Sequence, residues 1–187
     1  MDIERQALEY IQRYVRYGFY RRAEVERIVG EDVFSGAIPR KRIREMVKAE
    51  VERQRAEQQS WPAVTDCDRL DQVFASLEKE GVLALHNAGL TPSEGIAEMS
   101  DRYHQAGGAA SDIVGYCFYH RQDMEYVLET GMLSLAFGDI KGDNHRGVKI
   151  GERIRDSLEA AGFEVAWNGS IKDKLTIKGF RWQRRAP

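Results

Sequence analysis

The sequence predicts an α/β or α+β protein: a mixed sheet of about five strands flanked by helices, with an N-terminal helical extension. Two observations predict this class. Residues 1–60 carry only helical spacings of apolar side chains, whereas from residue 61 onward short apolar runs alternate with helical patterns. We therefore expect two domains, a helical extension over 1–60 and a mixed α/β sheet domain over 61–187.

Three helices account for the extension. The first covers 3–17, where apolar side chains recur at spacings of three and four, and it ends at Gly18. A short second helix covers about 21–29. The third begins near Pro39, because proline is favoured in the first turn of a helix. Each helix has one apolar stripe, so the three can bury one another's stripes.

The sheet domain shows five apolar runs that predict strands, at 82–86, 113–119, 132–137, 163–167 and 174–180. The last two are joined through Asn168-Gly169, residues that tolerate the positive φ of a tight hairpin. Helical patterns follow Thr65, Thr91, His120 and Arg146. The strongest is Thr91-Pro92-Ser93-Glu94, which has a capping hydroxyl, a first-turn proline and a carboxylate three residues after the cap.

The composition excludes several classes of protein. The 187 residues are 42% hydrophobic and 31% charged with a net charge of −2, which is typical of a folded globular protein and not of a disordered chain. No apolar run approaches the roughly 18 residues of a membrane span, and charges occupy the start, where a signal peptide would be apolar. We expect a soluble cytoplasmic protein that does not bind membranes.

Motifs for common cofactors are missing from the sequence. Cys67 and Cys117 match no metal-ligand spacing, and the glycines form neither GxGxxG nor GxxxxGK[ST], the two loops that cradle phosphates. No GxSxG elbow marks a nucleophilic serine. We therefore expect no cofactor.

Four blocks carry a family resemblance: WPAVTDCDRLDQVFASLEKEGVLALHNAG, GYCFYHRQDME, LAFG, and the approximate pattern VGxxIxxxLxxxGxxVxWxGS over 148–170. Together they resemble a family of uncharacterised bacterial proteins known only as a domain of unknown function. Many members have a cysteine-rich stretch just after the first strand, where this chain has residues 87–91 without cysteine. The resemblance implies a bacterial, cytoplasmic protein and supplies no activity.

Polar side chains follow three of the predicted strands. His86 and Asn87 end the first, His120 ends the second with Asp123 one helical turn later, and Asp139 follows the third. If these strands are parallel, their carboxyl ends meet at one edge, where open α/β folds gather ligands. An imidazole with a nearby carboxylate suits a general base and its orienting group, or two ligands of a divalent metal.

These positions give the candidate sites. His86, His120 and Asp123 are the candidate catalytic residues, and the same three with Asp139 are candidate metal ligands. The candidate binding residues are Asn87, Asp139, Asn168 and Ser170, the last two because the hairpin turn can approach the same region. The structural alternative is that His120 flanks the helix at 121–129 while Asp123 stabilises its positive N-terminal end.

Two functions stay open. The leading hypothesis is a small cytoplasmic binding or interaction protein without catalysis, whose aromatic-rich N-terminal helices contact a protein partner or a second copy of the chain. The alternative is a metal-assisted hydrolase with its site at the strand ends. Nucleic-acid binding is not expected, although Arg40-Lys41-Arg42 is basic, because residues 30–38 exceed the turn of a helix-turn-helix.

Overall fold

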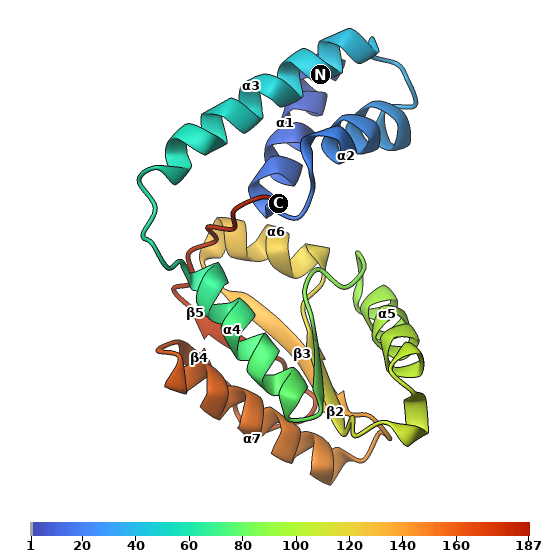
Figure 1. Cartoon of the computed structure of the whole chain (residues 1–187), viewed down its shortest axis with the longest axis vertical. Helices are drawn as coiled ribbons and strands as arrows, with labels where there is room; N and C mark the ends of the chain where they lie inside the picture. Colours follow the sequence, from blue (N-terminus) through green and yellow to red (C-terminus); the bar gives the residue numbers. More distant parts are fainter. Residues whose placement is uncertain (1) are drawn as a thin grey trace. The chain divides into compact units, whose positions relative to one another are not determined.

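The computed structural model describes residues 2–187 (Figure 1), which divide into two compact units. The first contains the residues through Thr65 together with Gln183–Pro187, and the second is Asp66–Trp182. No helix among the described residues is long and apolar enough to cross a membrane.

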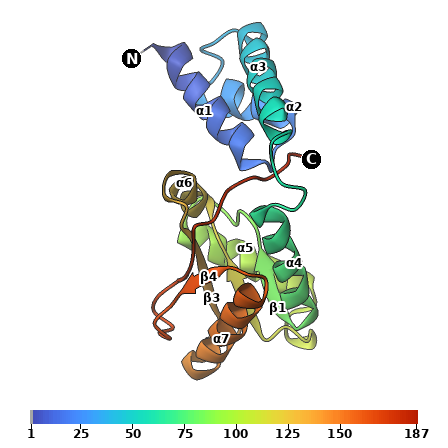
Figure 2. The same ribbon diagram turned by 90° about the vertical axis from the view of Figure 1, so that its left-hand side faces the viewer.

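The first unit is helical. Its elements are α1 (Ile3–Tyr17), α2 (Arg22–Arg27), a π-helical turn η1 (Ile28–Val33) and α3 (Arg40–Gln58). Helices α1 and α3 lie side by side in both views (Figures 1 and 2) and bury Ile11 and Val47. The second helix, predicted at 21–29, is shorter in the structure, where it ends at Arg27. From Ile28 the backbone widens into the π turn.

The carboxyl-terminal residues pack on this helical unit. The Arg184 guanidinium lies 4.5 Å from the centre of the Phe19 ring, and Arg185 donates a hydrogen bond to the Pro62 carbonyl at 2.9 Å. Helix α1 ends at Gly18, whose φ of 73° is left-handed. A side chain at Gly18 would collide with the backbone of Arg184, so glycine permits both the turn and the close approach.

The second unit contains the sheet. Its elements are α4 (Asp66–Lys79), β1 (Val82–Leu85), α5 (Pro92–Gln105), the 3-10 turn η2 (Gly108–Ala110), β2 (Gly115–Phe118), α6 (Arg121–Thr130), β3 (Leu133–Asp139), α7 (Asn144–Ala160), β4 (Glu164–Ala166) and β5 (Leu175–Lys178). The strands lie in the order β1-β2-β3-β5-β4. Only β1 and β2 are parallel, and the other neighbours are antiparallel. The predicted five-stranded mixed sheet with an N-terminal helical extension is confirmed.

Helices cover both faces of this sheet. Helices α4 and α7 contact each other and lie side by side over one face (Figure 1), where Gly151 of α7 meets the Phe137 ring. On the other face, Met99 of α5 belongs to a buried cluster with Leu85 and Phe118. This alternation follows from the period of two along each strand, which sends successive side chains to opposite faces.

Local sequence signals set the helix ends of this unit. At α5, the Thr91 hydroxyl accepts from the Glu94 backbone N–H and the Glu94 carboxylate accepts from that of Thr91 at 3.1 Å, as the sequence predicts. At α7, the Asp143 carboxylate accepts from the Arg146 N–H at 2.9 Å. The same bond with the helix backbone lowers the pKa of Asp143, because it stabilises the charged form.

Candidate functional site

Strand direction decides which predicted site residues lie at the same edge. Strands β1 and β2 are parallel, so His86 and His120 both follow strands that end at one edge of the sheet. Strand β3 is antiparallel to β2, and Asp139 pairs with Gly115, the first residue of β2. Asp139 therefore lies at the opposite edge, where β1 and β2 begin. The expectation that Asp139 joins the histidines at one edge is therefore wrong, because it assumed a third parallel strand.

His120 and Asp123 lie together at the start of α6. The Asp123 carboxylate accepts from the His120 N–H at 3.1 Å, and the Asp123 N–H lies 3.3 Å from Nδ1 of His120, so the two residues form a reciprocal cap. His120 is 3% exposed and Asp123 is 8% exposed. The structural alternative from the sequence, a histidine and a carboxylate that cap this helix, is what the structure shows.

Lys174, just before β5, completes this buried cluster. Its ammonium nitrogen lies 2.8 Å from Oδ1 of Asp123 and 3.2 Å from Nε2 of His120. A neutral His120 ring uses Nδ1 in one of two ways: unprotonated, Nδ1 accepts from the Asp123 N–H and completes the cap, and protonated, it donates to the Asp123 carboxylate while Nε2 accepts from Lys174. Burial and, to a lesser extent, the Lys174 charge lower the pKa of His120, and Asp123 only partly opposes them. The histidine is therefore neutral at neutral pH.

His86 belongs to a different cluster. Its Nδ1 lies 2.8 Å from the Tyr119 hydroxyl and its Nε2 lies 3.3 Å from a carboxylate oxygen of Asp71, while its ring stacks on Phe74 at 4.4 Å. His86, Asp71 and Phe74 line a cavity of about 390 Å³, which Glu98 of α5 also lines. Tyr119 is fully buried, so this histidine is held by its neighbours on three sides.

The four candidate metal ligands are not gathered into one site. His86 pairs with Asp71, His120 pairs with Asp123, and Asp139 lies at the opposite edge. Over residues 2–187, no group of three or more histidine, cysteine, aspartate or glutamate side chains is placed to hold a metal ion. A catalytic zinc site ordinarily uses three protein ligands and an open position. The fit to such a site is poor.

The other predicted binding residues mostly shape loops. Asn87 follows β1 with a φ of 51°, a left-handed conformation that asparagine tolerates better than most residues. Asn168 donates to Asp173 at 2.8 Å and accepts from the Ser170 N–H at 2.9 Å. The Trp167 indole donates to the Ser170 carbonyl at 2.9 Å. Asn168 and Ser170 thus stabilise the connection between β4 and β5.

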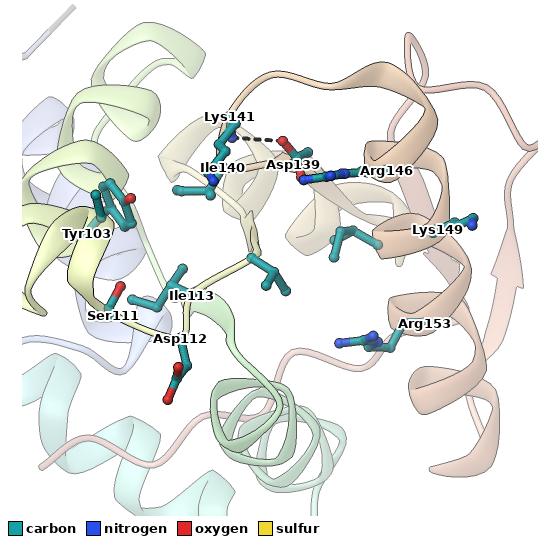
Figure 3. A pocket seen from close by; sticks show the side chains of 13 residues that line it. Tyr103, Ser111, Asp112, Ile113, Asp139, Ile140, Lys141, Arg146, Lys149 and Arg153 are labelled. Atoms are coloured by element: carbon teal, nitrogen blue, oxygen red, sulfur yellow. Dashed lines mark hydrogen bonds between the residues drawn. The ribbon is translucent and has the colours of Figure 1, made fainter.

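Asp139 lines a cleft of about 540 Å³ at its own edge of the sheet (Figure 3). One wall is α7. The facing wall is built from the segment 111–114 before β2 and from Ile140 and Lys141 after β3, with Tyr103 of α5 beside them. The Asp139 carboxylate accepts from the backbone N–H groups of Lys141 at 2.8 Å and Asp143 at 3.1 Å, which fixes the loop that leads into α7.

The cleft is positively charged. Its cationic residues are Lys141, Arg146, Lys149 and Arg153, against two carboxylates, Asp112 and Asp139, in a chain whose net charge is negative. The charged ends of Lys141 and Arg146 form no ion pair and no hydrogen bond among residues 2–187, although the Arg146 charge helps to lower the pKa of the Asp143 carboxyl group, and the Lys149 ammonium group points away from the cleft (Figure 3). Arg153 donates to the Glu80 carbonyl at 3.3 Å. Cations without a protein partner in a recess favour an anionic ligand.

Sequence reasoning missed the cations of this cleft. Arg146 and Arg153 lie on either side of Ile150 at positions that share one face of the helix, and this pattern is readable in the sequence. The same pattern is typical of any solvated helix with an apolar stripe, so only the facing wall distinguishes a cleft from an ordinary surface. Asp139 is the one predicted binding residue that lines this cleft.

A family model described as "Domain of unknown function (DUF6891)" matches residues 1–186. The chain belongs to this family. The predicted resemblance to a domain of unknown function is therefore confirmed, and the match to DUF6891 spans both the helical unit and the sheet unit. No curated protein and no solved structure matches the chain. Functional inference for this DUF6891 chain thus depends on the chemistry of its own residues.

Proposed function

We propose that this protein binds a small anionic ligand in the cleft between α7 and the segment 111–114, and that it acts as a binding protein without catalysis. One observation carries the proposal: Lys141 and Arg146 line a recess of about 540 Å³, and their charged ends form no ion pair or hydrogen bond within residues 2–187. Recesses of roughly 300–1,000 Å³ are typical of small-molecule sites.

The chemistry of the lining supports a carboxylate or phosphate group. A guanidinium offers several donors in a planar fork that matches these anions, and hydrogen bonds to charged groups contribute about 1.5–3 kcal/mol each. Apolar side chains, Ile113, Val114 and Ile150, lie beside the cations. They lower the local exposure to water, which strengthens the attraction between opposite charges.

The rival sites support other functions less well. A metal-assisted hydrolase requires ligands that converge, and the His86 and His120 clusters are separate pairs. Nucleic-acid binding requires free cations in the helical unit. Of the basic run Arg40-Lys41-Arg42, Arg40 already pairs with Glu31 at 2.9 Å and Arg42 with Glu4 at 2.9 Å, which reduces the positive charge that this run offers to a phosphate backbone.

A second candidate function is protein binding through the helical unit. Helix α1 leaves Ile3 and Leu8 exposed, and Leu8 borders a groove of about 480 Å³ with Met46 of α3. The predicted aromatic cluster contributes less to such a face, because Tyr14 and Tyr17 are buried against each other at 5.6 Å. Native mass spectrometry of the wild-type chain and of Leu8→Glu tests this: an oligomer or partner complex lost in the variant supports it, and a monomer without partner in both rejects it.

We place this activity in the bacterial cytoplasm. The resemblance to bacterial proteins supports the source, and Cys67 and Cys117, which are buried and form no disulfide within residues 2–187, are compatible with a reducing compartment.

Isothermal titration with inorganic phosphate and with small carboxylates at low salt tests the cleft. We expect binding to the wild-type chain that is about tenfold weaker in Arg146→Gln, because one charge-assisted interaction is lost. Arg155→Gln is the matched control: it removes the same charge from α7, but Arg155 pairs with Asp156 at 2.7 Å and does not line the cleft. Absence of binding, or equal loss in both variants, contradicts the proposal.

A further inference from the structure

The cations of the cleft are spaced along one helix. Arg146 and Arg153 are separated by seven residues of α7, which is close to two full turns, so they share one side of the helix and lie about 10 Å apart along its axis. Figure 3 shows both guanidinium groups directed from α7 toward the opening, while the Lys149 ammonium group points away from it. A single small anion would therefore reach both arginines only if their side chains left these directions and converged.

The middle of the cleft is apolar. Ile150 lies between the two arginines on the same side of α7, and Ile113, Val114 and Ile140 belong to the facing wall. Val114 is 45% exposed, although valine is usually buried. An apolar segment of a ligand that covered these side chains would gain roughly 25 cal/mol for each Å² of apolar surface removed from water.

The two ends of the cleft differ in how the arginines are held. At one end, the neighbouring Asp139 carboxylate is engaged by the backbone N–H groups of Lys141 and Asp143, and it forms no ion pair with Arg146 within the described chain. At the other end, Arg153 donates one hydrogen bond to the Glu80 carbonyl, and its Nε lies 3.9 Å from the Glu80 carboxylate. Most of the five guanidinium donors of Arg153 remain available.

From this order of cation, apolar wall and cation, and on the basis of the proposed anion site, we infer that the natural ligand is an elongated molecule with an anionic group at each end. An apolar segment joins the two groups, and its length matches the spacing of about 10 Å between Arg146 and Arg153. One end binds Arg146 with Lys141 beside it, and the other end binds Arg153. The apolar segment lies against Ile150.

A chain-length series tests this inference. We propose calorimetric titration of the full chain, at neutral pH and low salt, with saturated dicarboxylates from succinate to sebacate and with decanoate, which has the same length as sebacate but one charge. We expect affinity to rise along the series, and sebacate to bind at least about tenfold more tightly than both succinate and decanoate. The second charge is responsible for the gain over decanoate, and the matched length for the gain over succinate.

Variants locate the effect. Arg153→Gln should reduce sebacate affinity to that of decanoate and leave decanoate affinity unchanged within about twofold, whereas Arg155→Gln should preserve the difference. If inorganic phosphate binds and depends on Arg146, but sebacate shows no advantage over succinate or decanoate, the elongated ligand is rejected and the anion site remains. If neither phosphate nor any carboxylate binds, both the anion site and the elongated ligand are rejected.

Discussion

The cluster of His120, Asp123 and Lys174 makes a sharp prediction about stability. Lys174→Met keeps a long apolar side chain but removes the ammonium group that lies 2.8 Å from the Asp123 carboxylate. Asp123 is 8% exposed, so the variant leaves a nearly buried carboxylate without the ammonium group, although it keeps its contacts with the His120 N–H and imidazole. Such a loss destabilises the folded protein because the charge has been removed from water without its cation.

The magnitude follows from burial. Removing one partner of a fully buried ion pair costs about 3–5 kcal/mol. The Lys174 side chain is 33% exposed, so water screens part of the interaction, and we expect a loss of about 1–3 kcal/mol in the free energy of unfolding. Urea denaturation at neutral pH measures this loss. The slope of the unfolding free energy against urea concentration should be the same in the wild-type chain and in the variant.

Lys178→Met is the matched control, because Lys178 lies four residues after Lys174, at the end of β5. Lys178 pairs with Glu164 at 3.0 Å, but both side chains are at least half exposed, so this variant should lose less than about 1 kcal/mol. A double-mutant cycle of Lys174→Met with Asp123→Asn should give a coupling free energy of about 1 kcal/mol or more. Equal losses in Lys174→Met and Lys178→Met, or zero coupling, would refute the role of this cluster.

Three further predictions follow from the same structure. Burial lowers the pKa of His120 in the folded state below its ordinary value of 6.5, so below that pH the unfolded chain binds more protons than the folded chain. The free energy of unfolding should therefore fall as the pH drops below about 6.5, and it should fall by less in His120→Asn. An identical pH dependence of urea denaturation in both proteins would contradict this. Gly18→Ala should destabilise the protein more than Gly36→Ala. Both positions have a left-handed φ, which costs an alanine about 1–2 kcal/mol, but only at Gly18 would the new methyl group meet the backbone of Arg184. Equal melting temperatures of the two variants would show that the carboxyl-terminal residues do not pack there. Burial also raises the pKa of the Cys117 thiol, so Cys117 should be alkylated slowly in the folded protein and fast in urea. Mass spectrometry measures both rates, and rapid labelling of the native chain would contradict the burial of Cys117.

Local signals in the sequence were reliable where a few neighbouring residues determine the structure. The cap of α5 at Thr91 and Glu94 follows from side chains three residues apart, and the structure shows both hydrogen bonds of the box. The end of α1 at Gly18 follows from the freedom of glycine to adopt a positive φ. The five strands were recognisable because apolar runs with strand-forming residues stand between turn signals.

Strand direction was not recognisable, because it depends on which strands pair. The connection from β2 through α6 to β3 is long enough for either direction, and the structure has β3 antiparallel to β2. That single feature moved Asp139 to the opposite edge from His120. It also placed Asp139 beside α7, in the cleft that the functional proposal now uses.

The partners of the candidate residues were equally hidden. Lys174 lies 51 residues beyond Asp123 in the sequence, and nothing in its surroundings predicts that it contacts α6. Arg146 and Arg153 belong to a helix that resembles any amphipathic surface helix in the sequence. They can be interpreted as a binding site only because the segment 111–114, roughly thirty to forty residues earlier in the sequence, faces them across a recess.

The most direct measurement of the central claim is a titration of ¹⁵N-labelled protein with inorganic phosphate, followed by the side-chain Nε–H signals of the arginines in NMR spectra. We expect the signals of Arg146 and Arg153, on the cleft side of α7, to shift progressively and saturate, while the signal of Arg155 on the same helix does not move. Shifts of equal size at all three arginines, or none at Arg146 and Arg153, would contradict an anion site in this cleft.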